Sequence, residues 1–382
     1  MNFISIRINV KIFKKKSIKR VEVLNMDSYR FGAGRYIQEN NALDFCGEEI
    51  KRYGNKAYVI GGNTAIAVTE KRLCSSFEKY GLAYYMERFS GYPSVQKIEG
   101  LKAVVKEKDC NVLVGVGGGR IMDLAKAAAF ELGIPIVAIP TQAATCAAYS
   151  PLSVLYTPEG HSDNYIHFEY EVNAIIVDNQ VMLTQSPRLL ASGILDGMAK
   201  YIEIATLHPK VLDGNTSIAR NSAFYMAKYT YDVLGQKGEK AVSDLKTGVW
   251  TKDLHDVIYV NIALTGIVSA LMQGKGQTAL GHAFNNALHR DFLEYIKKWL
   301  HGEGVALGLL AQLVYNGEDN QVEELKRLMK EFDMPCSLAE IGINTSPEIN
   351  EKLFQRLCTY SFMTHDKEHE ELLKKAIESV GE

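Results

Sequence analysis

Two hydrophobic patterns divide the chain near residue 186. Before that point, short apolar runs of strand length alternate with helical stretches, as where 112–116 is followed by 121–132. This alternation predicts βαβ units and an open parallel sheet. From Pro187 onward the apolar positions recur at helical spacing, and no convincing strand is visible. We therefore predict an α/β N-terminal domain over 26–186 and an all-α C-terminal domain over 187–382.

The same patterns set the predicted elements. In the first half we expect an extended piece at Tyr29-Arg30-Phe31, strands and turns over 150–186, strands at 57–60, 82–88, 112–116, 134–139 and 172–177, and helices at 37–53, 64–80, 94–107 and 121–132. In the second half we expect helices at 187–207, 217–234, 239–247, 253–272, 277–290, 302–315, 320–332, 348–360 and 367–379.

Residues 1–25 differ from the rest of the chain because they carry a cluster of lysines and one arginine behind a short apolar stretch. A secretory signal has its charges before the apolar run, so this segment does not fit one. It is either a basic interaction arm or an extension upstream of a true start at Met26. We favour the extension.

Composition excludes several classes of protein. The net charge of −2 over 382 residues gives no global footprint for nucleic acid or for an anionic membrane. No apolar run approaches the roughly 20 residues that a membrane helix needs. The six cysteines are scattered, without CxxC or zinc-finger spacing, which fits reduced thiols in a cytoplasmic protein.

Glycine turns follow two of the predicted strands. Gly117, Gly118 and Gly119 come directly after 112–116, and Gly61-Gly62 follows 57–60. Glycine lets backbone N–H groups approach a phosphate closely, and ligands of open parallel sheets lie at the carboxyl ends of strands. Both turns could line one cofactor crevice, although a glycine cluster alone also fits a tight loop without a ligand.

Polar residues in apolar helices mark the second half. Asp196, His282 and His301 lie in or beside such helices, and one aspartate with two histidines could hold a divalent metal with an open position for a substrate oxygen. Their spacing matches no compact metal motif, so core histidines with hydrogen-bonded rings are the alternative. Lys200 lies four residues after Asp196 on the same helix face, either as an ion pair or as a cation that binds a substrate carboxylate.

Cys146 follows a predicted strand end and should face the crevice. A nucleophilic cysteine needs a base or a helix N-terminus to lower its pKa, and the sequence offers no evident partner. We interpret Cys146 as a residue that shapes the pocket. The other seven histidines lie in polar surroundings and are expected at the surface.

Five motifs in order resemble the glycerol dehydrogenase branch of the iron-containing alcohol dehydrogenase family: GGGRIMDLAK, PTQAATCAAYSPLSVLYT, GILDGMAKYIE, GHAFNNAL and HGEGVALG. The resemblance covers the chain from about Tyr29 to the C-terminus. It implies a dehydroquinate synthase-like fold, with a nicotinamide-binding α/β domain, a helical metal-binding domain and an active site between them. We also expect a homo-oligomer.

The resemblance assigns site residues by position. The metal ligands would be Asp196, His282 and His301. The cofactor residues would follow the glycine turns and the next strands: Gly62, Gly118, Gly119, Asp123, Thr141, Thr145, Ser150, Leu152 and Tyr156. Lys200 stands where iron-dependent relatives carry a fourth ligand, a histidine, which favours a three-ligand zinc-type site.

Three departures change the expected chemistry. Cys146 replaces the aspartate that contacts the polyol in glycerol dehydrogenases. The sequence around Cys146 more closely resembles the hydroxycarboxylate dehydrogenase subgroup, which reduces 2-oxo acids with NADPH. Gly62 replaces the aspartate that holds the ribose hydroxyls of NAD, so NADP becomes at least as suitable as NAD. Asn285 replaces a second histidine that could relay protons.

These observations predict a metal-dependent NAD(P) oxidoreductase that acts on the CH–OH group of a small alcohol, polyol or 2-hydroxy acid, with 2-oxo acid reduction favoured. Glycerol dehydrogenase is the alternative within the family. A dehydroquinate synthase-like lyase is the alternative of another class, but its phosphorylated substrate would need more cations than Arg120 and Lys200. Lys200 and Cys146 are the candidate catalytic residues.

Overall fold

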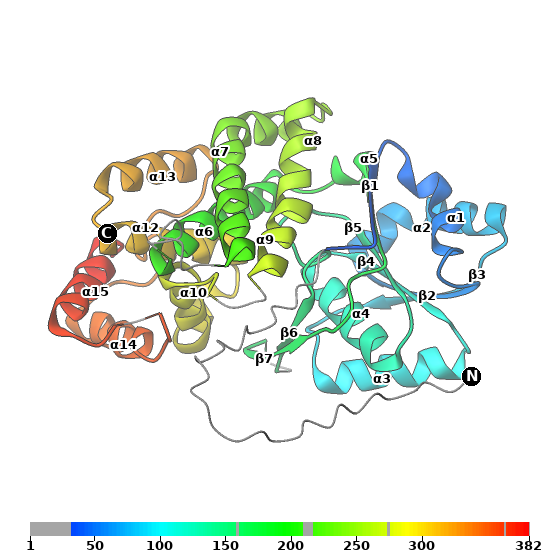
Figure 1. Cartoon of the computed structure of the whole chain (residues 1–382), viewed down its shortest axis with the longest axis horizontal. Helices are drawn as coiled ribbons and strands as arrows, with labels where there is room; N and C mark the ends of the chain where they lie inside the picture. The colour runs from blue at the N-terminus through cyan, green and yellow to red at the C-terminus, as the bar shows by residue number, and fades with distance from the viewer. Residues whose placement is uncertain (1–31, 158–159, 209–216, 273–275, 363, 382) are drawn as a thin grey trace, which may run out of the picture.

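The computed structural model describes residues 32–157, 160–208, 217–272, 276–362 and 364–381 (Figure 1). The basic segment 1–25 and the expected extended piece at 29–31 lie outside the described residues. Within them, a parallel sheet with its helices forms one half of the molecule and a bundle of helices forms the other, and Figure 1 shows the two side by side. The predicted fold class, an α/β first half followed by a helical half, is confirmed.

The main sheet contains six parallel strands in the order β1-β8-β5-β4-β2-β3. Their bounds are Arg35–Glu39 for β1, Lys56–Gly62 for β2, Ala83–Phe89 for β3, Val112–Gly117 for β4, Ile136–Pro140 for β5 and Ala174–Asp178 for β8. The chain passes outward from β2 to β3 and then returns to β4 on the other side of β2. The strand order therefore reverses between β2 and β4, where sheets of this type bind their ligands.

Helices cover both faces of this sheet. Successive strand residues point to opposite sides, so the buried strands present apolar side chains on both faces. On one face Val59, Val114 and Val137 pack against η1 (Ala42–Phe45), α1 (Cys46–Ile50) and α2 (Asn63–Tyr80). On the other face Tyr58 and Leu113 pack against α3 (Val95–Glu107) and α4 (Gly119–Leu132). The core on this second face continues without a break into the helical half.

The helical half begins at residue 187 and contains no strand among its described residues. Its helices are α6 (Pro187–Leu207), α7 (Ile218–Lys246), α8 (Lys252–Tyr259), the π-turn η2 (Val260–Leu264), α9 (Thr265–Leu271), α10 (Leu280–Asp291), α11 (Leu293–Ile296), α12 (His301–Tyr315), α13 (Asp319–Glu331), α14 (Pro347–Leu357) and α15 (Lys367–Ser379). The short helix α5 (Asn179–Met182) precedes them.

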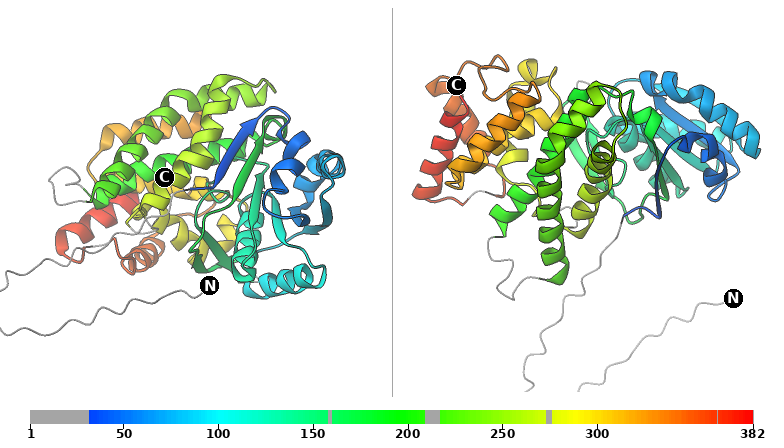
Figure 2. Two further views of the ribbon diagram at one scale, coloured as in Figure 1. Left: turned by 45° about the vertical axis from the view of Figure 1, so that its right-hand side comes forward. Right: turned by 90° about the horizontal axis from the view of Figure 1, so that it is seen from above.

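Besides the core that they share, the halves meet at a β-hairpin and at the edge of the sheet. The hairpin of β6 (Leu152–Tyr156) and β7 (Ser162–His167) leaves the α/β half, and β7 contacts α10. At the sheet edge, β1 lies beside α8, as the views in Figure 2 show. There the Gln38 amide donates to the His255 carbonyl at 3.0 Å, and Tyr36 packs edge-on against Tyr259. The sheet edge at β1 is therefore covered by the helical half.

Three of the predicted helices were wrong. The helix expected at 37–53 is β1 followed by η1 and α1, because Arg35–Glu39 pairs in parallel register with β8. The two helices expected at 217–234 and 239–247 are one helix, α7. Gly238 lies inside α7 with its Cα facing Ile194 of α6, so close helix packing keeps a glycine that the sequence pattern reads as a break.

The helix over 252–271 is continuous through α8, η2 and α9. By length and composition it could span a membrane, and it is the only described helix to do so. Because 72% of its apolar window is buried inside the protein, it fits the core helix of a globular half equally well.

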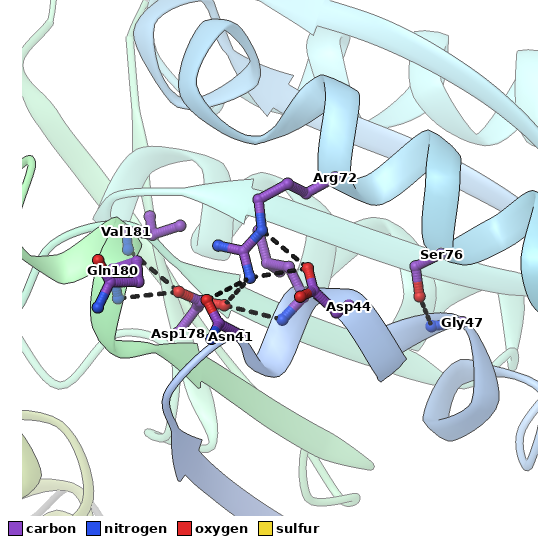
Figure 3. A network of polar contacts seen from close by, with 9 residues as sticks. Asn41, Asp44, Gly47, Arg72, Ser76, Asp178, Gln180 and Val181 are labelled. Atoms are coloured by element: carbon purple, nitrogen blue, oxygen red, sulfur yellow. Dashed lines mark hydrogen bonds and ion pairs between the residues drawn. The ribbon is translucent and has the colours of Figure 1, made fainter.

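An ion-pair network ties α2 to the carboxyl edge of the sheet (Figure 3). The Arg72 guanidinium donates to Asp178 at 2.9 Å and to Asp44 at 2.9 Å. The buried Asp178 carboxylate also accepts from the backbone N–H groups of Leu43, Gln180 and Val181. This network fixes the end of β8 against η1 and the start of α5.

Candidate functional site

The glycine turn after β4 lies at the reversal point of the sheet. Gly117 has φ of +152°, and a Cβ on it would lie 2.9 Å from the Ile121 side chain and 3.6 Å from the Gly62 nitrogen. The ends of β2 and β4 therefore meet, as predicted. Gly118 is the N-cap of α4, and no side chain caps that helix. Free N–H groups and the positive end of the helix dipole make this turn suited to a phosphate.

The loop after β5 runs from this turn toward the helical half. The Thr141 N–H donates to the Gly117 carbonyl at 3.1 Å, and a Cβ on Gly119 would lie 3.4 Å from Thr145 Oγ1. The loop continues through Cys146 to Ser150 and then enters β6, whose first and last residues are Leu152 and Tyr156. The structure thus brings the predicted cofactor residues of this loop and strand to one side of α4.

Asp123 is buried in the second turn of α4, with 6% of the residue exposed. Burial raises the pKa of its carboxyl group to about 6, although the nearby Lys126 ammonium lowers it. The carboxylate faces Lys126, 3.5 Å away, and accepts from the backbone of Val154. Asp123 therefore joins α4 to β6 and lies below the crevice surface.

Asp196, His282 and His301 come together from three helices of the second half. One ligand atom from each lies within 4.8 Å of the other two, although the residues are far apart in the sequence. Asp196 Oδ1 lies 3.3 Å from His282 Nε2 and 3.5 Å from His301 Nε2. This oxygen is buried, yet no other described residue gives it a properly directed hydrogen bond. An orphaned carboxylate oxygen that faces two imidazole nitrogens fits a divalent metal.

Glu203 orients His282 from behind. The fully buried Glu203 carboxylate lies 2.5 Å from His282 Nδ1, and it accepts from the backbone N–H groups of Ala279 and His282. Burial lowers the pKa of His282, but Glu203 and Asp196 outweigh it and raise this pKa to about 9. With Nδ1 held by a carboxylate, Nε2 is directed at the site, as in the carboxylate–histidine–metal arrangement.

The ring of His301 is held by a neutral amide, whereas that of His282 is held by a carboxylate. Asn285 Nδ2 lies 3.2 Å from His301 Nδ1, while Asn285 Oδ1 is buried without a partner among the described residues. Exchange of the two similar amide atoms would let Oδ1 accept from Nδ1–H and leave Nε2 free to bind a metal. The His301 side chain is 41% exposed against 12% for His282, so the site opens on the His301 side.

Lys200 and Cys146 line the space beside this cluster. Lys200 is 6% exposed, one turn from Asp196, and its ammonium makes no hydrogen bond or ion pair with another described residue. Burial raises the pKa of the Cys146 thiol, which the Lys200 ammonium lowers only in part. The thiol is therefore protonated near neutral pH, consistent with a residue that shapes the pocket.

The π-turn η2 fixes the loop between the halves. It turns Asn261 so that its Nδ2 donates to the Ala143 carbonyl at 2.9 Å and approaches the Leu190 carbonyl at 3.4 Å. From the other side, the Ala143 N–H donates to Gln185 at 2.9 Å. A π-turn of this kind often marks a functional site. Here both backbone groups of Ala143 are clamped, which sets the loop that carries Cys146.

Sequence reasoning missed Glu203, Lys126 and Asn261. A signal existed for the first two, because Glu203 lies seven residues after Asp196 on one face of α6, and Lys126 lies three residues after Asp123 in an apolar helix. Charged residues that repeat along a buried helix face indicate a shared site. No sequence signal indicated Asn261, since its orientation depends on the π-turn.

Known proteins resemble this chain in both sequence and fold. The family model for iron-containing alcohol dehydrogenases matches residues 33–179. A glycerol dehydrogenase of Thermotoga maritima is 31% identical over 87% of this chain and 90% of its own length. Hydroxycarboxylate dehydrogenase A of Escherichia coli is 34% identical over 79% of this chain and 82% of its own.

The chain belongs to the iron-containing alcohol dehydrogenase family. It is an oxidoreductase of that family. The crystal structure of glycerol dehydrogenase from Schizosaccharomyces pombe superposes with a TM-score of 0.81 at 25% identity, over 93% of this chain and 90% of that one. The family resemblance expected from the five motifs is thus confirmed.

Proposed function

We propose that this protein is a cytoplasmic, zinc-type dehydrogenase that reduces small 2-oxo acids with NAD(P)H and oxidises the matching 2-hydroxy acids. The observation that carries the substrate class is the Lys200 ammonium, which belongs to a residue only 6% exposed and forms no ion pair with another described residue. A substrate carboxylate would supply the missing partner.

The residues fit both cofactors of such a reaction. Asp196, His282 and His301 would hold one divalent metal, with two imidazole nitrogens and one carboxylate oxygen as zinc often has. A metal bound there would supply a Lewis acid for the substrate oxygen, and a nicotinamide would supply the hydride. The protein's own part is to orient: Glu203 fixes His282, and Lys200 aligns the carboxylate.

Cys146 supports an oxo acid over a polyol. A protonated thiol carries no charge and accepts hydrogen bonds weakly, so it is a poor partner for several hydroxyl groups. It also leaves the Lys200 charge for the substrate, whereas an aspartate at this position would neutralise it. The similarity to hydroxycarboxylate dehydrogenase A supports the same choice. Glycerol oxidation is the alternative, supported by the names of several relatives.

The end of β2 supports NADP as well as NAD. Gly62 stands at the strand end, and the first turn of α2 contains no acidic residue. No carboxylate there would repel a 2′-phosphate. A Cβ on Gly62 would meet its neighbours at 3.8 and 3.9 Å, which is ordinary contact, so an aspartate fits.

One panel tests the proposal. The zinc-loaded protein is assayed for oxidation of NADH and of NADPH with 2-oxobutyrate, 2-oxoglutarate and dihydroxyacetone, and for the reverse reaction with glycerol. We expect the highest kcat/KM with a 2-oxo acid, and we expect Gly62→Asp to reduce kcat/KM with NADPH by roughly tenfold or more while activity with NADH persists. A preference for glycerol and dihydroxyacetone would overturn the substrate class.

A further inference from the structure

Lys126 is a buried lysine that the chemistry described so far does not use. Its side chain is 1% exposed and lies in the middle of α4, one turn beyond Asp123. Four polar groups surround its ammonium. Nζ donates to the Ser150 carbonyl at 3.0 Å and to the Leu152 carbonyl, and it lies 3.5 Å from both Ser150 Oγ and Asp123 Oδ1.

These contacts connect α4 to the segment that leads into β6. The Ser153 hydroxyl donates to the Asp123 carbonyl at 2.8 Å, which adds a second attachment between the same two segments. The Ser150 N–H and the Tyr149 N–H both donate to the Cys146 carbonyl, at 3.0 and 2.8 Å. The position of Cys146 therefore depends, through one tight turn, on where Lys126 holds Ser150.

Residues 150–152 lie where we expect the nicotinamide half of the cofactor to bind. The glycine turn before α4 fits the pyrophosphate, and the cluster around Asp196 marks the reacting carbon. The chain between these two places is the loop after β5, which touches the turn at Gly119 and approaches Lys200 at Cys146. The nicotinamide would lie along this loop, whereas the adenosine half would lie on the other side of the glycine turn, toward β2.

We propose that Lys126 is a positioning residue that holds residues 150–152 so that the nicotinamide half of the cofactor lies against the metal-binding cluster. This inference rests on the proposed function, because it assumes a bound nicotinamide cofactor. Lys126 touches neither cofactor nor substrate. Its partners are two main-chain carbonyls, the Ser150 hydroxyl and one carboxylate, all of which can accept from the three donors of a lysine ammonium.

The affinities of two nucleotides distinguish misplacement of the nicotinamide from a general loss of cofactor binding. NAD(P)H contains the nicotinamide, and the matching ADP-ribose, with its 2′-phosphate where NADPH is the better cofactor, lacks it. The affinity of each is measured by calorimetry on the full-length, zinc-loaded protein and on Lys126→Met. We expect the Kd of NAD(P)H to rise about tenfold, as for loss of a charged hydrogen-bonding group, and that of the ADP-ribose to change by less than about twofold.

Hydride transfer gives a second readout. A misplaced nicotinamide should lower kcat by up to roughly 100-fold. Zinc content should stay at the wild-type level, because Lys126 makes no hydrogen bond or ion pair with Asp196, His282 or His301. Lys102→Met is the matched control, since Lys102 pairs with Glu99 and Glu131 near the surface of the neighbouring helix α3. It should leave both affinities unchanged.

Each outcome decides the proposal. Equal losses for the two nucleotides, or no loss for either, would overturn the role of Lys126. Failure of the wild-type protein to bind NAD(P)H would instead overturn the proposed function. If Lys126→Met does not fold, Lys126→Gln replaces it, because its amide can still donate to one carbonyl. This variant should then show the same selective loss for NAD(P)H, in smaller degree.

Discussion

The two halves of this molecule build their parts of the site in opposite ways. The α/β half offers backbone groups: a glycine turn, the uncapped start of α4 and a loop held by main-chain contacts. The helical half offers side chains, with Asp196, His282 and His301 converging from three separate helices. A backbone site needs only a short local motif, whereas a side-chain site needs the whole packing of its helices. Substitutions should therefore act differently in the two halves.

Removal of a ligand charge should have the largest effect. Asp196→Asn keeps the shape of the side chain but removes the charge that faces both histidines. We expect loss of stoichiometric zinc and a fall in kcat/KM of roughly 1,000-fold or more, since the Lewis acid contributes several kcal/mol. Metal analysis and steady-state kinetics measure both.

Asp244→Asn is the matched control, because Asp244 is a mostly buried aspartate of α7 that pairs with Lys240 and Thr251 instead of the cluster. It should retain zinc and activity. Full activity of Asp196→Asn without zinc would refute the metal site.

Loss of the charge behind His282 should have the next largest effect. Glu203→Gln preserves an oxygen for the N–H groups of Ala279 and His282 but removes the carboxylate from His282 Nδ1. We expect zinc to bind about 10- to 100-fold more weakly, as for other partners of metal-binding histidines. Competition with a chelator measures this. Unchanged zinc affinity would mean that the orientation of His282 does not depend on Glu203.

On the backbone side, Gly119→Ala should weaken cofactor binding without harming the fold. The new Cβ would lie 3.4 Å from Thr145 Oγ1 and 3.6 Å from Ala147 Cβ, so the protein accommodates it, but it enters the space for a phosphate. We expect a Kd for NAD(P)H raised about tenfold with an unchanged Tm. In the control Gly100→Ala, the methyl group meets open space on α3, and affinity should not change. Equal affinities in both variants would contradict a phosphate site at Gly119.

The pH dependence of zinc binding should be the mildest effect. In the metal-free protein the pKa of His282 is raised to about 9, so the ring is protonated at neutral pH. Zinc needs the deprotonated ring, so binding should release a proton and strengthen as pH rises, by up to about tenfold per pH unit below pH 9. Calorimetry in buffers of different ionisation enthalpy measures the released proton. Affinity that is independent of pH from 6 to 8 would exclude a raised pKa at His282.

The same contrast explains what the sequence could predict. The α/β class, the glycine turns and the grouping of Asp196, His282 and His301 could be predicted, since a turn is local and the five motifs carry the family resemblance. The contacts that hold the site residues in place could not be predicted from the sequence. Asn261 reaches Ala143 only because η2 has a π-turn, and Lys126 reaches Ser150 only because β6 packs against α4. β1 was mistaken for helix because its pairing with β8 joins residues far apart in the chain.

In the proposed function Lys200 binds the substrate carboxylate, so its replacement tests the account most directly. We would measure kcat/KM for a 2-oxo acid and for dihydroxyacetone with zinc-loaded wild type and Lys200→Met. The account predicts a loss of roughly 100-fold for the 2-oxo acid, as for removal of a charged hydrogen-bonding partner, and less than about threefold for dihydroxyacetone. Equal kinetics on the 2-oxo acid in the two proteins would contradict the proposed substrate class.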